Sequence, residues 1–340
     1  SPVLPWPRSV VKSFTRTVSY ETASIRDEMV RTVGETPQRG GGGGGLAPGA
    51  EQRLNFSARG DFAWNTTGET VTPVPVTLGD RQLQLWTTPH GVIKMAMASN
   101  AAVQGNTFSF TSPGRFRVRA TVNNQNLVEK IDAVVPNAVL GDMPVEIQYA
   151  DYKDFGGVKF PMKIKQTIGG HPALDLTVTD VQPNAAVNIA IPDPILQTPA
   201  PYAKVTSQSV ADGVWFVSGG SHNSVLIVME DHLILVESPI NDDRAVAVLG
   251  EVKKLSPKPI KYVIASHHHF DHSGGLRAVS ADGATIIAHD ANKAFLERML
   301  AAPATLELPA ELPLGMKADG SVLQVEARVQ RQVVGDGELP

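Results

Sequence analysis

The segment Ser266-His-His-His-Phe-Asp-His-Ser-Gly-Gly275 places four potential metal ligands within six residues: His267, His269, Asp271 and His272. It directly follows a short apolar run, residues 262–265, which predicts a strand. On an extended segment, side chains two positions apart project the same way, so His267 and His269 share a face. The chain then turns, and Asp271 and His272 begin a helix near the same point. The segment therefore predicts a metal site on the loop that leaves a strand.

The ligand types narrow the metals that such a site would accept. Imidazole and carboxylate donors suit Zn²⁺, although Mn and Fe also accept this set. The chain contains no cysteine, which excludes disulfides and thiolate metal sites. The alternative is a histidine-rich surface loop that binds metal adventitiously, but these ligands are spaced rather than merely repeated. Gly274 and Gly275 have no side chains, and we expect them to let the backbone pass close to a ligand.

The pattern His267-x-His269-x-Asp271-His272 resembles the H-x-H-x-D-H motif of the metallo-β-lactamase superfamily. The resemblance covers residues 203–340 and implies the first half of an αββα sandwich, with α/β organisation. It implies that His267 and His269 bind one metal ion and that Asp271 and His272 bind a second, with zinc the expected metal at both places in the complete protein. Glu237 stands where the family usually has Asp, and the resemblance implies that it orients a ligand histidine.

The same resemblance implies a metal-dependent hydrolase. A metal-bound hydroxide would attack an ester, amide or thioester-like small-molecule substrate, and Asp271 would orient the nucleophile and accept its proton. His222 and His268 are candidates for the substrate pocket: His222 lies on a hairpin loop, and His268 occupies a variable position of the motif. A redox branch of this fold typically carries Glu where His269 stands and uses iron, so His269 disfavours it.

The resemblance also implies ligands that the chain lacks. The family has a third histidine, a bridging aspartate and a last histidine downstream of the first motif, whereas His289 is the only histidine after His272. Asp336 ends a strand-like run without the surrounding sequence that the family shows. We therefore expect a truncated chain that holds half of each metal site, binds zinc weakly and hydrolyses little. The alternative function is a non-catalytic binding module for an apolar or lipid-like ligand, with a vestigial metal motif.

Composition limits the partners. The 340 residues carry a formal net charge of -4, and a nearly balanced charge gives no electrostatic footprint for nucleic acid. No run of apolar residues is long enough for a transmembrane segment. The oligomeric state stays open.

The first part of the chain predicts a curved antiparallel sheet in an α+β domain. Residues 116–122, 127–135, 145–149, 158–165 and 174–179 read as strands, most of them with alternating apolar and polar residues, which indicates one wet face. Residues 149–161 resemble lipoprotein-carrier-like periplasmic domains. That resemblance implies an apolar concavity and a periplasmic or secreted location, while a cytoplasmic location stays open. Prolines at 192, 194, 199 and 201 predict a boundary, giving domains at 1–195 and 203–340 and a linker at 196–202.

Further elements follow from local patterns. Strands are expected at 14–20, at 25–31 on an edge, and from residue 61; residues 81–98 permit a helix that Pro89 kinks or splits. Residues 40–45 are glycine and predict a flexible loop. In the second domain, strands at 214–217, 224–228, 232–236, 261–265 and 284–288 alternate in the later part with helices after Asn241, after Gly275 and at 291–300. This order predicts a layered α/β domain.

Overall fold

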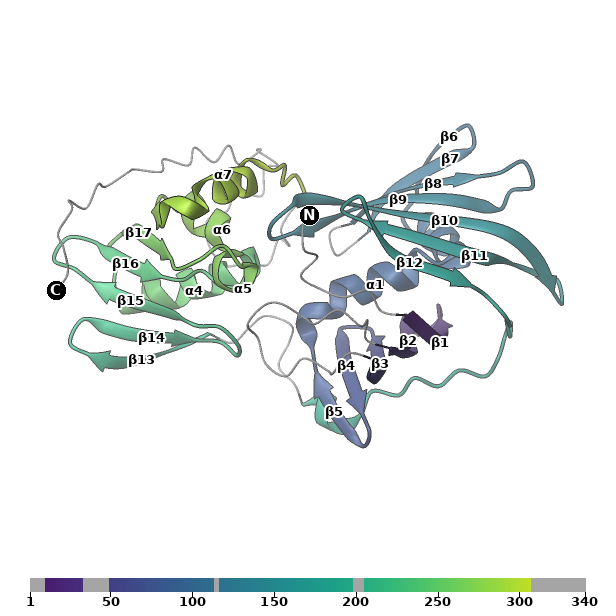
Figure 1. The fold of residues 1–340 in the computed structure, drawn as a ribbon, viewed down its shortest axis with the longest axis horizontal. Helices are drawn as coiled ribbons and strands as arrows, with labels where there is room; N and C mark the ends of the chain where they lie inside the picture. The colour runs from purple at the N-terminus through teal and green to yellow at the C-terminus, as the bar shows by residue number, and fades with distance from the viewer. Residues whose placement is uncertain (1–9, 33–48, 113–115, 198–204, 307–340) are drawn as a thin grey trace.

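The computed structural model describes residues 10–32, 49–112, 116–197 and 205–306, which form three β-sheets with helices packed against them (Figure 1). The glycine run at 40–45, most of the predicted linker and Asp336 lie outside the described residues. The division into domains at 1–195 and 203–340 stays a prediction. None of the helices in the described ranges combines the length and the apolar character needed to span a membrane.

The first sheet is an antiparallel meander in the order β1-β2-β3-β4-β5. Its strands are β1 (Val10–Ser19), β2 (Ser24–Thr32), β3 (Glu51–Arg59), β4 (Phe62–Thr67) and β5 (Thr70–Pro73). Strand β2 pairs with both β1 and β3, so the expectation of an edge strand at 25–31 is wrong. The charges that suggested an edge are paired across the sheet, where Arg16 donates to the two carboxylate oxygens of Asp27 at 2.7 and 2.6 Å. A carboxylate paired in this way can be buried, as Asp27 is.

Two helices lie between the first and second sheets: α1 (Leu78–Trp86), preceded by the short η1 (Pro75–Thr77), and α2 (Pro89–Ala98). The break before Pro89 confirms the predicted split. Pro89 begins α2, a position where a backbone N–H would have no hydrogen-bond partner within the helix, so proline loses nothing there. The Thr88 hydroxyl caps the helix by accepting from Gly91 N at 3.2 Å. Leu85 packs into the core of the first sheet and Leu83 into that of the second, so the helices join the two sheets.

The second sheet has the order β12-β11-β10-β9-β8-β7-β6, and neighbouring strands are antiparallel. Its strands are β6 (Ala102–Gln104), β7 (Thr107–Ser112), β8 (Phe116–Val122), β9 (Val128–Asn137), β10 (Gly141–Phe155), β11 (Val158–Ile168) and β12 (His171–Thr177). In β8, buried Phe116 and Val118 alternate with exposed Arg117, which confirms the wet face. The apolar face packs on Val92 and Ala96 of α2. The chain then returns to the first sheet, where Ile195 in the short α3 (Asp193–Leu196) is buried.

The third sheet has the order β13-β14-β15-β16-β17-β18, antiparallel up to β16 and parallel from β16 to β18. Its strands are β13 (Thr206–Ala211), β14 (Val214–Ser218), β15 (Ser224–Val228), β16 (Leu233–Val236), β17 (Ile260–Ala265) and β18 (Thr285–Ala288). The helices are α4 (Asp242–Leu255), α5 (Phe270–Ser273), α6 (Leu276–Ala281) and α7 (Lys293–Ala301), with η2 (Asp290–Asn292) before α7. Asn241 caps α4 by accepting from Arg244 N at 3.0 Å, as expected.

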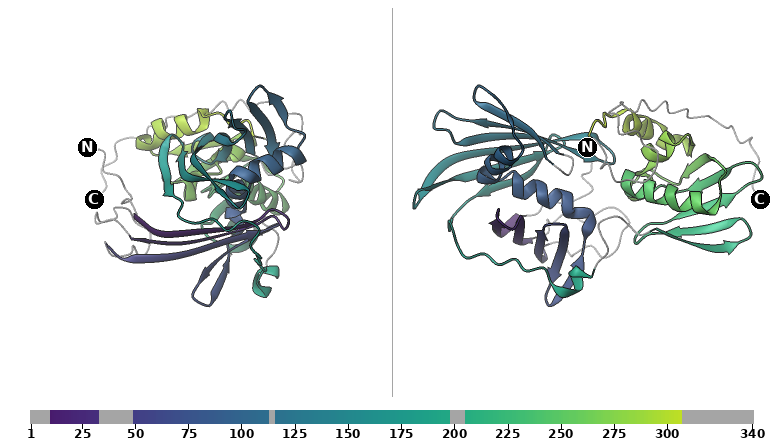
Figure 2. Two further views of the ribbon diagram at one scale, coloured as in Figure 1. Left: turned by 90° about the vertical axis from the view of Figure 1, so that its right-hand side faces the viewer. Right: turned by 180° about the vertical axis from the view of Figure 1, so that it is seen from behind.

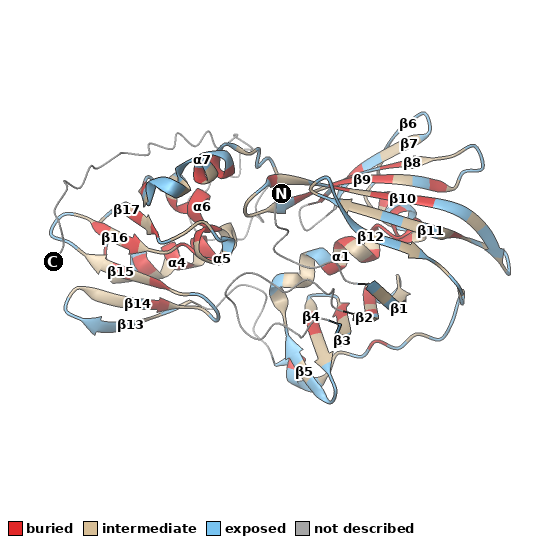
Figure 3. Ribbon diagram, viewed as in Figure 1, coloured by how far each residue is buried: buried red, intermediate tan, exposed pale blue. Residues whose placement is uncertain are grey.

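Helices α4, α6 and α7 share one buried core with this sheet, visible as the buried segments in Figure 3. Its apolar residues include Leu226, Leu235 and Val263 from the strands and Leu276 from α6. The layered α/β arrangement predicted for this part of the chain is therefore present. The third sheet lies apart from the first two sheets, as the view from behind also shows (Figure 2).

The segment after α7 joins this unit to the second sheet at the turn between β9 and β10. Asp142 N donates to Pro303 O at 2.5 Å, and Thr305 N donates to Asp142 Oδ1 at 2.9 Å. Arg117 lies 3.1 Å from the other carboxylate oxygen of Asp142. Gly141 adopts a φ of 69° and has Pro303 O directly against it, so a side chain there would collide with the crossing segment. The β9–β10 turn is therefore shaped for this contact.

Candidate metal centre

The histidine segment leaves the carboxyl end of β17, beside the carboxyl end of the parallel strand β16. Side chains that follow adjacent parallel strands meet at one edge of the sheet, where open α/β sheets place their ligands. The segment turns at residues 266–269 and enters α5 at Phe270. The predicted strand exit followed by a helix is therefore present.

Backbone hydrogen bonds fix the segment against the loop that follows β16. Ser238 N donates to His272 O at 3.1 Å, and Ile240 N donates to Phe270 O at 3.0 Å. In the other direction, Gly275 N donates to Ser238 O at 2.9 Å. These bonds hold the α5 turn along the β16–α4 loop independently of any side chain.

The two glycines of the motif serve this contact. A Cβ on Gly275 would lie 2.6 Å from Ala245 Cβ and 2.7 Å from Ser238 Oγ, and one on Gly274 would collide with the Ile240 carbonyl. We expected the glycines to let the backbone approach a ligand, but the partner that they approach is the protein itself. They let the motif approach the β16–α4 loop, because two backbones this close leave no room for a side chain.

Three of the predicted ligand histidines gather at one point. The ring centroids of His267 and His269 lie 4.8 Å apart, and those of His267 and His272 lie 4.2 Å apart. Ser266 Oγ lies 3.0 Å from His267 Nδ1, so the Nε2 atom of this ring stays free of that contact. The three histidine rings of the motif therefore lie close together, and their role as ligands of a shared metal centre stays a prediction.

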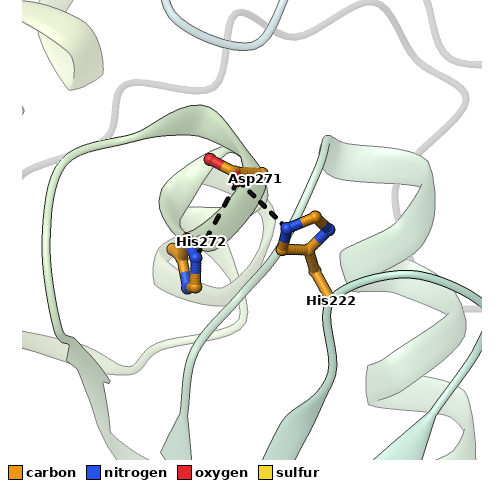
Figure 4. Close-up of side chains that lie close together, drawn as sticks. All are labelled: His222, Asp271 and His272. Carbon is orange, nitrogen blue, oxygen red and sulfur yellow. Dashed lines mark ion pairs between the residues drawn. The ribbon is translucent and has the colours of Figure 1, made fainter. Parts of the chain in front are cut away.

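Asp271 contacts a histidine of the β14–β15 loop, which is distant from it in the sequence. Its Oδ2 atom lies 3.0 Å from His222 Nε2 and 3.9 Å from His272 Nε2 (Figure 4). Each of the three residues offers a ligand atom, and these atoms all lie within 4.8 Å of one another. The three side chains are about one third exposed, so a metal ion or a substrate can reach them.

Glu237 directly follows β16, and its carboxylate contacts two residues of the histidine segment. Its Oε2 atom lies 2.9 Å from His272 Nδ1, and its Oε1 atom accepts from Ser266 N at 2.9 Å. A carboxylate only accepts hydrogen bonds, so Nδ1 carries the proton, and in the neutral ring Nε2 is the nitrogen left to bind a metal. Glu237 adopts a φ of 67° and Ile240 a φ of 73°. Non-glycine residues in this region cost about 1–3 kcal/mol each, and such strain clusters at functional sites.

His268 points to a different neighbour. Its Nδ1 atom lies 3.1 Å from Asn292 Oδ1, and its ring centroid lies 4.8 Å from that of Phe295 in α7. The structure therefore places His268 between the motif and α7, and a substrate role for it stays a prediction. His289 is also accounted for locally, because its Nδ1 atom accepts from Ala291 N at 3.1 Å and caps η2.

The electrostatics favour a neutral imidazole at His267. Burial lowers the pKa of His267 below its ordinary value, and the neighbouring rings of His272 and His269 lower it further. Metal ions bind the neutral ring, so this shift favours metal binding at neutral pH.

Part of the chain is similar to known proteins. Residues 217–324 match the family model described as the Metallo-beta-lactamase superfamily, and this part of the chain belongs to that superfamily. A metallo-β-lactamase from Hirschia baltica is 28% identical, with 28% of this chain and 48% of that chain covered and a TM-score of 0.26. One from Pseudomonas aeruginosa, solved in a mono-zinc form, is 24% identical over 28% of this chain and 46% of that chain, also with a TM-score of 0.26.

A mutant metallo-β-lactamase from Cronobacter sakazakii is 29% identical over 29% of this chain and 40% of that chain, with a TM-score of 0.26. The chain thus spans less than half the length of these solved structures. Their metals and activities describe those proteins.

Proposed function

We propose that this chain is a metal-dependent hydrolase whose ligands are His267, His269, Asp271 and His272. The observation that supports the proposal is the cluster of side chains after β17. The ring centroid of His267 lies 4.2 Å from that of His272 and 4.8 Å from that of His269, and Asp271 Oδ2 lies 3.9 Å from His272 Nε2. The superfamily of residues 217–324 suggests the same reaction class.

The residues present fit a divalent metal. The donors are imidazoles and a carboxylate, a set that suits Zn²⁺ and also admits Mn or Fe. In this proposal His267 and His269 would hold one ion, and Asp271 and His272 would hold a second. A metal ion held there supplies Lewis acidity, which polarises a substrate carbonyl and lowers the pKa of a coordinated water to about 7.

The chain's own residues perform the remaining tasks. Glu237 holds His272 Nδ1–H, so that Nε2 faces Asp271. In this proposal Asp271 orients the attacking water and accepts its proton. The substrate class that we propose is a small ester, amide or thioester, because its carbonyl is the group that such a site activates. We also propose a periplasmic or secreted location, from the likeness of residues 149–161 to periplasmic domains.

The alternative was a non-catalytic module that binds an apolar ligand on the second sheet. The apolar face of that sheet packs on α2 through Val92 and Ala96. This packing covers part of the surface that an apolar ligand would need, and we therefore prefer the metal-dependent function.

Zinc binding tests the proposal. Metal-free protein is titrated with Zn²⁺ against a chromophoric chelator for the wild type, His267→Ala, His272→Ala and the control His171→Ala, which removes an exposed imidazole from β12. Wild type and control should bind zinc equally, and the two motif variants at least tenfold more weakly. Hydrolysis of a panel of esters, thioesters and amides should depend on added zinc. Equal zinc affinity in all four proteins would refute the proposed site.

A further inference from the structure

The loop between β14 and β15 is built to present His222. Arg244 in α4 donates to the carbonyl oxygen of Gly219, and its Nη2 atom donates to His222 O at 3.0 Å. Gly219 lies so close to the guanidinium that a Cβ there would collide with it. Arg244 is 5% exposed, so both contacts are shielded from water. One buried cation thus holds both ends of the loop.

His222 itself adopts a left-handed backbone conformation with a φ of 55°. This region is unfavourable for a residue with a side chain, and it persists only where surrounding contacts impose it. Here the contact from Arg244 to the His222 carbonyl imposes it. The result is that the imidazole turns toward Asp271 on α5 (Figure 4).

The donor atoms have the spacing of a metal site. Bonds of about 2.0–2.1 Å in tetrahedral geometry place neighbouring donors roughly 3.3–3.4 Å apart. The distance from Asp271 Oδ2 to His222 Nε2 is 3.0 Å, and that to His272 Nε2 is 3.9 Å, so the two bracket this value. The rings of His222 and His272 stand at 82° to each other with centroids 5.3 Å apart, so both can direct a nitrogen at one point.

We propose that His222 is the third protein ligand of the metal ion bound by Asp271 and His272, and that Arg244 is the positioning residue that delivers it. This inference rests on the proposed function. Two imidazoles and a carboxylate are a donor set of the kind that catalytic zinc sites use. The ligand set of this ion then comes from one side of the sheet, from the β14–β15 loop and α5.

Cobalt substitution tests the inference. Metal-free wild type, His222→Ala, His222→Cys and the control His171→Ala, which removes an exposed imidazole from β12, are titrated with Co²⁺ and followed by visible absorption and metal analysis. His222→Ala should bind one ion at least tenfold more weakly and lose part of the cobalt spectrum, while His171→Ala should match the wild type. His222→Cys should restore binding with a thiolate-to-cobalt charge-transfer band, which is unambiguous because the chain has no other cysteine.

The outcomes separate the two proposals. No cobalt binding by the wild type would refute the proposed function. Binding by the wild type with an unchanged His222→Ala titration, or a His222→Cys protein without the charge-transfer band, would refute the ligand role of His222 alone.

The positioning role of Arg244 has its own readout. Arg244→Met should weaken cobalt binding, and the double variant with His222→Ala should bind no more weakly than His222→Ala alone, because Arg244 acts through His222. Additive losses in the double variant would overturn this role. A far-ultraviolet circular dichroism spectrum of each metal-free variant shows that the fold is kept.

Discussion

Replacing Glu237 with glutamine exchanges one carboxylate oxygen for an amide nitrogen. The side chain keeps its size, so the substitution tests the hydrogen bond that orients His272 while its packing stays the same. In the native protein, one carboxylate oxygen accepts from Ser266 N and the other from His272 Nδ1, both at 2.9 Å. An amide has only one acceptor atom. If that oxygen keeps the Ser266 contact, the amide NH₂ group faces His272 Nδ1, which must then accept. The ring proton moves to Nε2, the nitrogen that faces Asp271.

The size of the effect follows from this exchange. A hydrogen bond to a charged group contributes about 1.5–3 kcal/mol. Loss of a group that orients a ligand histidine typically weakens metal binding about 10- to 100-fold, which corresponds to about 1.4–2.7 kcal/mol. The Glu237 side chain is only 13% exposed, so solvent screening removes little of this contribution. We therefore expect Glu237→Gln to bind zinc about 10- to 100-fold more weakly than the wild type.

Chelator competition measures the affinity, and nitrogen chemical shifts of the imidazole rings report the tautomer of His272. Glu230→Gln is the matched control, because it removes the same charge from the β15–β16 turn, at the opposite end of β16. The reasoning is refuted if Glu237→Gln binds zinc within twofold of the wild type, or if His272 keeps its proton on Nδ1 in the variant.

Two further predictions concern stability, each measured by urea unfolding. Gly275→Ala should lower the free energy of unfolding by about 1–3 kcal/mol, because the added methyl group has no space. Gly79→Ala, in α1 with nothing within 4 Å, should be neutral or stabilising; equal effects of the two substitutions would contradict the packing argument. Burial raises the pKa of Asp142, but hydrogen bonds from Thr305 and the charge of Arg117 outweigh it, so the net pKa is lowered. The stabilisation by Asp142 is therefore present above about pH 4 and lost as the pH falls through the lowered pKa. Asp142→Asn should reduce the loss of the free energy of unfolding as the pH falls below about 4. An unchanged loss would show that the contact with residues 303–305 contributes nothing to stability in this pH range.

Much of the fold could be read from local patterns. Alternation in residues 116–122 and the helical spacing after Asn241 identified β8 and α4, because each buries one face. Strand β13 was not predicted, because Thr206–Ala211 is polar and exposed and is paired to β14 chiefly by its backbone. The internal position of β2 in its sheet was also missed, since the partner that neutralises Asp27 lies on another strand.

Part of the candidate metal centre could likewise be predicted from the sequence, and part could not. The motif residues lie within six positions, so their convergence follows from one turn, and Glu237 could be placed because it ends the neighbouring strand. The contact of His222 with Asp271 could not be predicted. It depends on the pairing of β15 with β16 and on a guanidinium from α4, neither of which leaves a local pattern around His222.

The attachment of the α5 turn to the β16–α4 loop also defines which segments would have to be moved together to graft the motif onto another protein. The hydrogen bonds from Ser238 and Ile240 use backbone atoms, so the side chains there can be exchanged while the loop still supports the turn. Grafting the histidine segment alone onto another strand would carry over the ligands without their geometry. For the motif alone, the smallest unit that a designer could move is the pair of segments 237–241 and 266–275 on adjacent parallel strands, with glycine kept at 274 and 275 because neither position has room for a side chain.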